Sequence, residues 1–170
     1  MNLDWGTEQL SDYAIRLRHH PAVAVWFTNF PLTATDRTNM RGAVTQIKAQ
    51  GGILLLTLQP AAGLGAVTDA AADDLAHGLA DVNNGGVPVI IRFAHEMNGS
   101  WYAWGQQPRA YIAAFRRLAV AVHSYAHGSA MMWAPASSPP SLPAPTTVPG
   151  ATTEPFRTST PSTAANTASP

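Results

Sequence analysis

Four short apolar runs, separated by longer segments of mixed polarity, organise residues 1–135 of this chain. The runs cover residues 22–28, 53–58, 87–93 and 130–133, and turn or capping residues bound each of them. Runs of this length that are apolar at nearly every position are typical of parallel strands covered by helices on both faces. We therefore predict a sheet of four parallel strands.

Segments with helical spacing of apolar residues separate the predicted strands. The helices are predicted to begin at Asp36, at Thr68 or Asp69, and at Pro108, and to end at Gly51-Gly52, Gly85-Gly86 and Gly128. Their predicted core-facing residues are Met40, Ala43, Val44 and Ile47, then Ala72, Leu75, Ala76, Leu79 and Val82, then Tyr111, Ile112, Phe115, Leu118, Ala119 and Val122. Alternating strands and helices predict right-handed crossovers, which both a partial barrel and a doubly wound sheet satisfy.

The character of the chain changes at Ala136. Residues 136–170 repeat proline among Ser, Thr and Ala, and only Leu142, Val148 and Phe156 offer sizeable apolar side chains. Such a segment buries too little surface to offset the entropy of ordering it, so we predict a disordered Pro/Ser/Thr-rich tail. A linker or O-glycosylated stalk explains this composition, and so does a mispredicted or frame-shifted gene end.

Composition argues against several classes of function. Ten basic residues balance ten acidic ones, so no net field attracts nucleic acid or an anionic membrane. No apolar run reaches the roughly 20 residues that span a bilayer, and residues 1–20 lack the apolar core of a secretion signal. There is no cysteine, and His123 and His127 have no third ligand in their pattern, so we predict neither a disulfide nor a metal site.

The stretch RFAHEMNGSWYAWG, residues 92–105, directly follows the third apolar run. Polar residues at the carboxyl end of a parallel strand lie where such folds hold their chemistry. A carboxyl group such as that of Glu96 suits general acid/base catalysis, and the flat faces of Trp101 and Trp104 suit packing against pyranose rings. The stretch therefore indicates one half of a sugar-cleaving site.

This stretch resembles the signature of glycoside hydrolase family 26, the retaining β-mannanases, and Met132-Trp133-Ala134-Pro135 resembles that family's next strand. The resemblance implies an α/β fold that is a partial (β/α)8 TIM barrel, roughly strands 1 to 5, because a whole barrel usually needs roughly 250 residues. Residues 1–135 are then a truncated catalytic domain that begins within the first barrel strand, at residues 2–6, and residues 136–170 are the tail. The chain is expected to be a piece of something larger.

The resemblance also implies roles for single residues. Glu96 matches the proton donor, which is the acid/base. Trp101 matches a subsite tryptophan and His95 an active-site histidine, with a buried structural histidine as the alternative. Asn98, Tyr102, Trp104 and Arg92 are further substrate-binding candidates. Asn98 could instead hold a left-handed turn before Gly99, and Tyr102 and Trp104 could instead pack the loop. Arg92 could instead pair with a carboxylate beneath the site. At the ends of other strands, Trp26, Phe30, Gln59, Pro60 and Trp133 suit a sugar-binding rim, and Trp26 and Trp133 equally suit the core.

Retaining glycosidases need two carboxyl groups about 5–5.5 Å apart. The family's nucleophile is a glutamate on the seventh barrel strand, which this chain lacks, and Glu154 lies within the Pro/Thr-rich tail. The resemblance therefore predicts a glycoside hydrolase that, when intact, acts on a mannan-like polysaccharide as an endo-β-1,4-mannanase. It implies no cofactor, and it implies an extracellular location for the intact family member. The alternatives are a non-catalytic carbohydrate-binding fragment, which binds mannan without turnover, and an inactive gene fragment without a stable fold.

Overall fold

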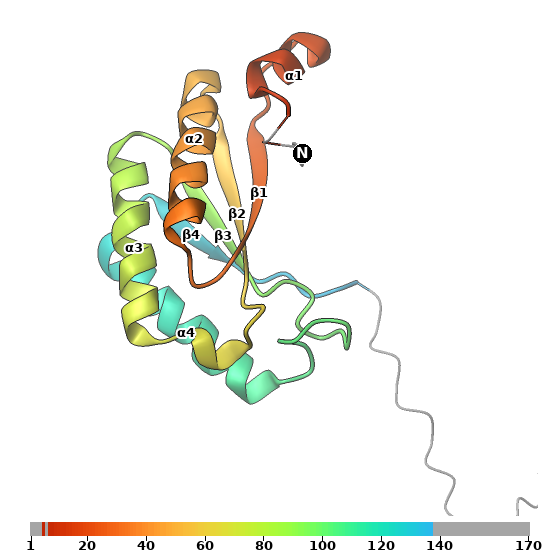
Figure 1. The fold of residues 1–170 in the computed structure, drawn as a ribbon, viewed down its shortest axis with the longest axis vertical. Coiled ribbons are helices and arrows are strands. Elements are labelled where there is room, and N and C mark those ends of the chain that lie inside the picture. Colours follow the sequence, from red (N-terminus) through yellow and green to blue (C-terminus); the bar gives the residue numbers. More distant parts are fainter. Residues whose placement is uncertain (1–4, 6, 138–170) are drawn as a thin grey trace, which may run out of the picture. The chain divides into compact units, whose positions relative to one another are not determined.

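The computed structural model of the chain describes residue 5 and residues 7–137, in which parallel strands form one layer and helices pack against it (Figure 1). In chain order the elements are α1 (Leu10–Leu17), β1 (Val23–Asn29), α2 (Ala34–Gln50), β2 (Ile53–Gln59), the 3-10 helix η1 (Leu64–Ala66), α3 (Asp69–Asn84), β3 (Val89–Phe93), α4 (Pro108–Tyr125) and β4 (Ser129–Met132). None of the helices in these ranges is long and apolar enough to cross a membrane.

All four predicted strands are confirmed, each to within two residues at either end. They form one sheet in the order β1-β2-β3-β4, and every neighbouring pair is parallel. Val25, Leu55, Ile90 and Ala130 lie in register across the sheet. The carboxyl ends of the strands therefore meet at one edge, as predicted for the candidate site.

Helices cover one face of this sheet among the described residues, which corrects the expectation that both faces are covered. Leu54, Leu56 and Leu58 on β2 are fully buried and share a core with side chains of α2, α3 and α4. Leu55, which points to the other face, stays partly exposed. The apolar run on β2 alone does not reveal this difference, because both of its faces carry aliphatic residues.

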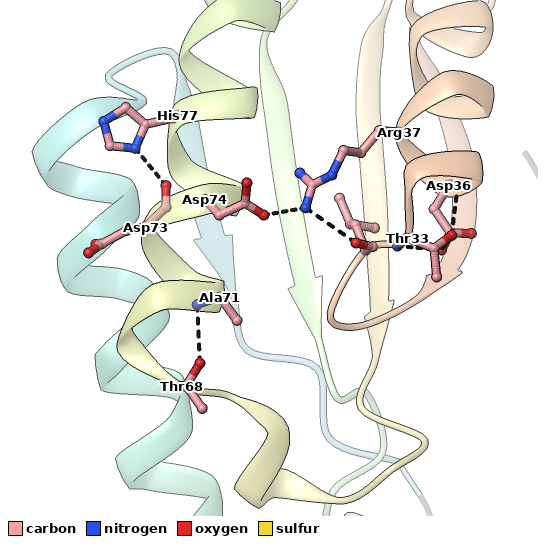
Figure 2. A network of polar contacts seen from close by, with 9 residues as sticks. Thr33, Asp36, Arg37, Thr68, Ala71, Asp73, Asp74 and His77 are labelled. Atoms are coloured by element: carbon pink, nitrogen blue, oxygen red, sulfur yellow. Dashed lines mark hydrogen bonds and ion pairs between the residues drawn. The ribbon is translucent and has the colours of Figure 1, made fainter.

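The helix ends use side-chain caps, some of them drawn in Figure 2. Thr33, not Asp36, is the N-cap of α2: its hydroxyl accepts from the Asp36 N–H at 3.1 Å, and the Asp36 carboxylate accepts from the Thr33 N–H at 2.9 Å. The prediction was wrong because both residues of this capping box are good caps and lie three positions apart. Thr68 caps α3, and Pro108 occupies the first turn of α4, as predicted.

Two other helix predictions need correction. Helix α1, which the pattern analysis missed, buries Leu10 and Ala14. On α4 the buried stripe contains Ala114 and Ala121, whereas the predicted Ile112 is 40% exposed. Positions 114 and 121 have helical spacing from Tyr111 and Leu118, so the same period could have included them. Helix α4 also ends at Tyr125, before the glycine predicted to end it.

The two ends of the sequence lie mostly outside the described residues. Of the predicted first strand, at residues 2–6, only Trp5 is described, and its indole N–H donates to the Val25 carbonyl at 3.0 Å. The predicted tail is described only as far as residue 137. Within the described residues, the segment that follows β3 contributes Ala94, Met97 and Trp104 to the same core as α2, α3 and α4.

Candidate active site

Left-handed backbone at Ala94 and Glu96 shapes the start of the loop after β3. Ala94 has φ 44° and Glu96 has φ 55°, which is uncommon for residues other than glycine. Hydrogen bonds hold both residues: the Ala94 N–H donates to the Leu58 carbonyl at 2.9 Å, and the Glu96 N–H donates to the Ala134 carbonyl at 2.7 Å. The extended alternation therefore ends at Phe93, and His95 and Glu96 do not follow the strand pattern.

The Glu96 carboxylate lies beside Trp101. The Trp101 indole N–H donates to Glu96 Oε2 at 2.8 Å, and Trp101 leaves 54% of its surface exposed. Gly99 makes this approach possible, because a Cβ atom at residue 99 would lie 2.6 Å from Trp101 Cε2. The site thus presents an exposed aromatic ring whose polar edge points to a carboxylate.

His95 is buried behind this pair, 8% exposed. Its Nε2 lies 3.2 Å from the Tyr102 hydroxyl, and the Phe27 ring meets the imidazole edge to face at 5.9 Å. Burial is the main cause that lowers the pKa of His95 below its ordinary value, and the Arg92 charge lowers it further. The Glu96 charge opposes this shift. The imidazole is therefore neutral near pH 7, and its buried Nδ1 has no hydrogen-bond partner among the described residues.

Trp104 packs the loop, the second of the two roles expected for it. It is 3% exposed, stacks on Tyr102 with ring centroids 4.4 Å apart, and donates its indole N–H to the His95 carbonyl at 2.9 Å. It therefore has no free face to offer a sugar. Tyr102 in turn contacts the His95 side chain.

Asn98 shows no left-handed backbone, so the turn expected before Gly99 is wrong, and its amide is engaged through both Nδ2 and Oδ1. Its Nδ2 donates to the Ala136 carbonyl at 3.1 Å, and its Oδ1 accepts from the Ala136 N–H at 2.7 Å. The side chain thus forms two hydrogen bonds with the Ala136 backbone and links the loop to the segment after β4. Sequence spacing could not show this contact, which joins residues 38 positions apart.

Arg92 has no carboxylate within ion-pair distance in the described part of the chain, so the expected ion pair is wrong there. Its Nε donates to the Thr57 hydroxyl at 2.9 Å, and its guanidinium carbon lies 5.0 Å from the centre of the Phe27 ring. Burial lowers the pKa of Arg92, and the nearby Glu96 charge opposes this shift. A half-buried cation therefore lies at the carboxyl end of β3 with an aromatic and a hydroxyl neighbour.

Phe27 and Thr57 were missed by sequence reasoning. Strand alternation could have found Phe27, because it points away from its neighbour Trp26, which packs against the core. Of the predicted rim residues, Phe30 is 2% exposed and packs against Phe93, so burial removes it from any rim. Trp133 is half exposed and packs against α4.

Three other carboxylates of the described residues form ion pairs. Glu8 pairs with Arg16, Asp74 with Arg37 and Asp69 with Arg117. Glu154 lies outside the described residues. Within residues 5 and 7–137, no cluster of three His, Asp or Glu side chains could hold a metal ion.

Comparisons of this chain with a family model and with known proteins agree on one family. The family model for glycosyl hydrolase family 26 matches residues 34–140. A mannan endo-1,4-β-mannosidase of Bacillus subtilis (strain 168) is 38% identical over 56 residues, which cover 30% of this chain and 16% of that protein. Mannan endo-1,4-β-mannosidase A and B of Caldalkalibacillus mannanilyticus is 42% identical over 53 residues, covering 26% of this chain and 10% of that protein.

Among solved structures, a GH26 β-mannanase from Bacteroides ovatus matches with a TM-score of 0.51 and 16% identity. The match covers 69% of this chain and 45% of that one, so the chain spans less than half of the similar structure. At this identity the likeness concerns the fold alone.

Proposed function

Because this chain belongs to glycosyl hydrolase family 26, we propose that it carries the proton-donating half of a retaining endo-β-1,4-mannanase site. The observation that carries the proposal is the Glu96 carboxylate, held by the exposed Trp101 at the carboxyl end of a parallel sheet. The corresponding fold is a partial (β/α)8 barrel, roughly strands 1 to 5, with residues 1–135 as the truncated catalytic domain and residues 136–170 as a tail.

In this proposal Glu96 is the acid/base. It donates a proton to the glycosidic oxygen of the leaving sugar and later takes a proton from the attacking water. Its half-exposed position, with one carboxylate oxygen held by the Trp101 N–H, leaves the other oxygen free to face a substrate. The proton transfer needs this fixed orientation, because a general acid acts only within hydrogen-bond reach of the atom it protonates.

Trp101 binds the sugar through its exposed face, on which the C–H side of a pyranose ring packs. His95 and Tyr102 form the wall behind Glu96, and the neutral imidazole orients sugar hydroxyl groups without adding charge. Arg92 supplies a cation at the base of the site. Trp104 and Asn98 support the loop from behind and serve the substrate indirectly.

The substrate class follows from the names of the relatives, which act on mannan. A neutral polysaccharide also fits a chain with equal numbers of acidic and basic residues. Double displacement needs a second carboxyl group about 5–5.5 Å from Glu96. We expect residues 1–170 alone to bind β-1,4-manno-oligosaccharides with little or no turnover, because the nucleophile is not among the residues assigned to the site.

Titration of the chain with a β-1,4-manno-oligosaccharide in a calorimeter tests this proposal. Trp101→Ala should weaken binding at least tenfold. Tyr125→Ala is the matched control, since Tyr125 is an aromatic side chain that is 44% exposed at the end of α4, before β4 begins, and it should bind as the wild type does. Equal binding by both variants would contradict the assigned site.

A non-catalytic carbohydrate-binding function is the second candidate, and the exposed Trp101 beside a single assigned carboxylate favours it. A reducing-sugar assay addresses both candidates. Hydrolysis that Glu96→Gln abolishes supports the enzyme and contradicts the expectation of little or no turnover, whereas binding without hydrolysis is what both candidates predict for residues 1–170. Hydrolysis that survives in Glu96→Gln contradicts the role given to Glu96.

A further inference from the structure

A groove between α2 and α3 opens to solvent on the helical layer of the fold, and its volume is about 490 Å³. Its floor is aliphatic: Met40 and Val82 are 4% and 7% exposed, and Val44 is partly exposed. None of the residues assigned to the candidate active site lines this groove, so it is a separate feature of the fold.

An ion pair closes the groove at one end, where Arg37 on α2 reaches Asp74 on α3 (Figure 2). Helices α2 and α3 run in the same direction, since each leads from the carboxyl end of one strand to the start of the next parallel strand (Figure 1). Residues with the same separation in sequence therefore lie opposite each other along the groove, because each helix advances about 1.5 Å per residue. The paired Arg37 and Asp74, 37 positions apart, set this register.

Beyond the ion pair, the same register places two cations opposite glycines. Arg41 lies opposite Gly78, and Lys48 lies opposite Gly85, and all four residues line the groove. Arg41 and Lys48 are exposed, and in the described part of the chain neither forms an ion pair. A Cβ atom at residue 78 would meet nothing within 4 Å. The groove therefore presents two cations and leaves empty the space that their carboxylate partners would fill.

The lining of the groove favours one class of ligand, an α-helix. Sugars pack on aromatic faces, and the described residues that line the groove include no aromatic ring. An extended peptide needs a free sheet edge for its backbone, whereas the backbone groups of α2 and α3 are bonded within their own helices. A third helix needs neither, because its side chains pack between the two helices as ridges in a groove.

The charges along the groove define the sequence pattern of that helix. Arg41 and Lys48 are seven residues, or about 10 Å, apart along α2, and two turns of a ligand helix span about the same length. Asp81 lines the groove opposite Val44, between the two cations, so it repels an acid at the midpoint. The complementary pattern is therefore an acid, then aliphatic residues, then a second acid seven positions after the first.

We propose that this groove docks an acidic amphipathic helix of a partner protein. Its two carboxylates pair with Arg41 and Lys48, and the aliphatic side chains between them pack on Met40 and Val44. Exposed ion pairs contribute little energy each, so the aliphatic floor supplies most of the affinity and the spacing of the charges supplies the specificity.

Fluorescence anisotropy with synthetic helical peptides tests the proposal. The probes are a set of labelled peptides with two glutamates seven positions apart and Leu, Ile or Val at the third and fourth positions after the first glutamate. Members of this set should bind the wild-type chain saturably. Replacement of both glutamates by glutamine, or a shift of the second glutamate to the fifth position after the first, should weaken binding at least tenfold.

Gly78→Asp is the decisive variant, because its new carboxylate can pair with Arg41 as Asp74 does with Arg37. It should weaken peptide binding at least tenfold without lowering the melting temperature, since a Cβ atom at this position meets nothing within 4 Å. Gly42→Asp is the matched control: it adds the same charge at an exposed glycine of α2 that does not line the groove. Its peptide affinity should stay at the wild-type value.

Three results would overturn the proposal. The first is that no peptide of the set binds saturably. The second is that Gly42→Asp and Gly78→Asp weaken binding equally, which would show a general effect of net charge. The third is that polygalacturonate, an acidic polysaccharide used as a competitor, binds in a way that Gly78→Asp removes while the peptides do not bind, which would assign the groove to an acidic sugar polymer.

Discussion

Replacement of Gly99 by alanine offers a sharp test of how the site is assembled. A Cβ atom at residue 99 would lie 2.6 Å from Trp101 Cε2, closer than real side-chain contacts allow. Gly99 has no left-handed backbone, so alanine fits the main chain there and only the indole ring must move. The ring can swing toward solvent, since Trp101 is already half exposed. Its hydrogen bond to Glu96 is then lost.

The expected magnitude follows from the two interactions that Trp101 provides. A hydrogen bond to a charged group contributes about 1.5–3 kcal/mol, and the low end applies because water reaches the half-exposed Glu96. Aromatic packing against the sugar adds up to about 1.5 kcal/mol. The packing energy acts on binding, so Gly99→Ala should weaken oligosaccharide binding up to about tenfold. The hydrogen bond lies within the protein itself, so its loss should lower the free energy of unfolding by up to about 1.5 kcal/mol.

Two assays read this prediction. Calorimetric titration with a β-1,4-manno-oligosaccharide measures the affinity, and the indole N–H resonance of Trp101 in an NMR spectrum without sugar reports whether the bond to Glu96 is broken. Gly78→Ala on α3 is the control, because a Cβ atom there meets nothing within 4 Å and both readouts should stay unchanged. An unshifted Trp101 resonance in Gly99→Ala, with wild-type affinity, would refute the reasoning.

Three further substitutions test other parts of the structure. His95 is buried and its pKa is lowered, so the unfolded state binds a proton on this residue more tightly than the folded state does. The free energy of unfolding should therefore fall as the pH drops below about 6.5, the ordinary pKa of histidine. Urea titrations above and below that pH should show a smaller loss for His95→Gln than for the wild type. Trp104→Ala should cost about 3–5 kcal/mol in urea unfolding, since this ring is 3% exposed, and a cost below 1 kcal/mol would contradict its packing role. Thr33→Ala should cost about 0.5–2 kcal/mol by the same assay because it breaks the capping box, whereas Thr45→Ala in the middle of α2 should cost less. A cooperative transition in these titrations would also argue against a gene fragment without a stable fold.

The sequence by itself determined the order of the elements and the place of the candidate chemistry. Apolar runs and helical spacing are local signals, because strands and helices impose periods of 2 and 3.6 residues on the chain that forms them. Parallel topology follows from alternation alone, so the carboxyl edge of the sheet, and Glu96 at that edge, could be predicted before any contact was known. The family resemblance rests on the same short stretch, residues 92–105.

Only the tertiary structure decided what the side chains of that stretch do. Trp101 and Trp104 are the same residue type three positions apart, yet one is half exposed and the other is buried against Tyr102. Asn98 is engaged by Ala136, and Arg92 by Thr57 and Phe27, through contacts between residues far apart in the chain. Such contacts carry no periodicity in the sequence.

The same limit applies to the sheet as a whole. The apolar runs indicate two faces that avoid water, but a run cannot say which face the chain's own helices cover, because aliphatic residues occur on both. Helices α2, α3 and α4 pack on the face that contains Leu54 and Leu56 and leave the face that contains Leu55 open. Burial is a property of three-dimensional packing, and it alone separates the covered face of the sheet from the partly exposed one.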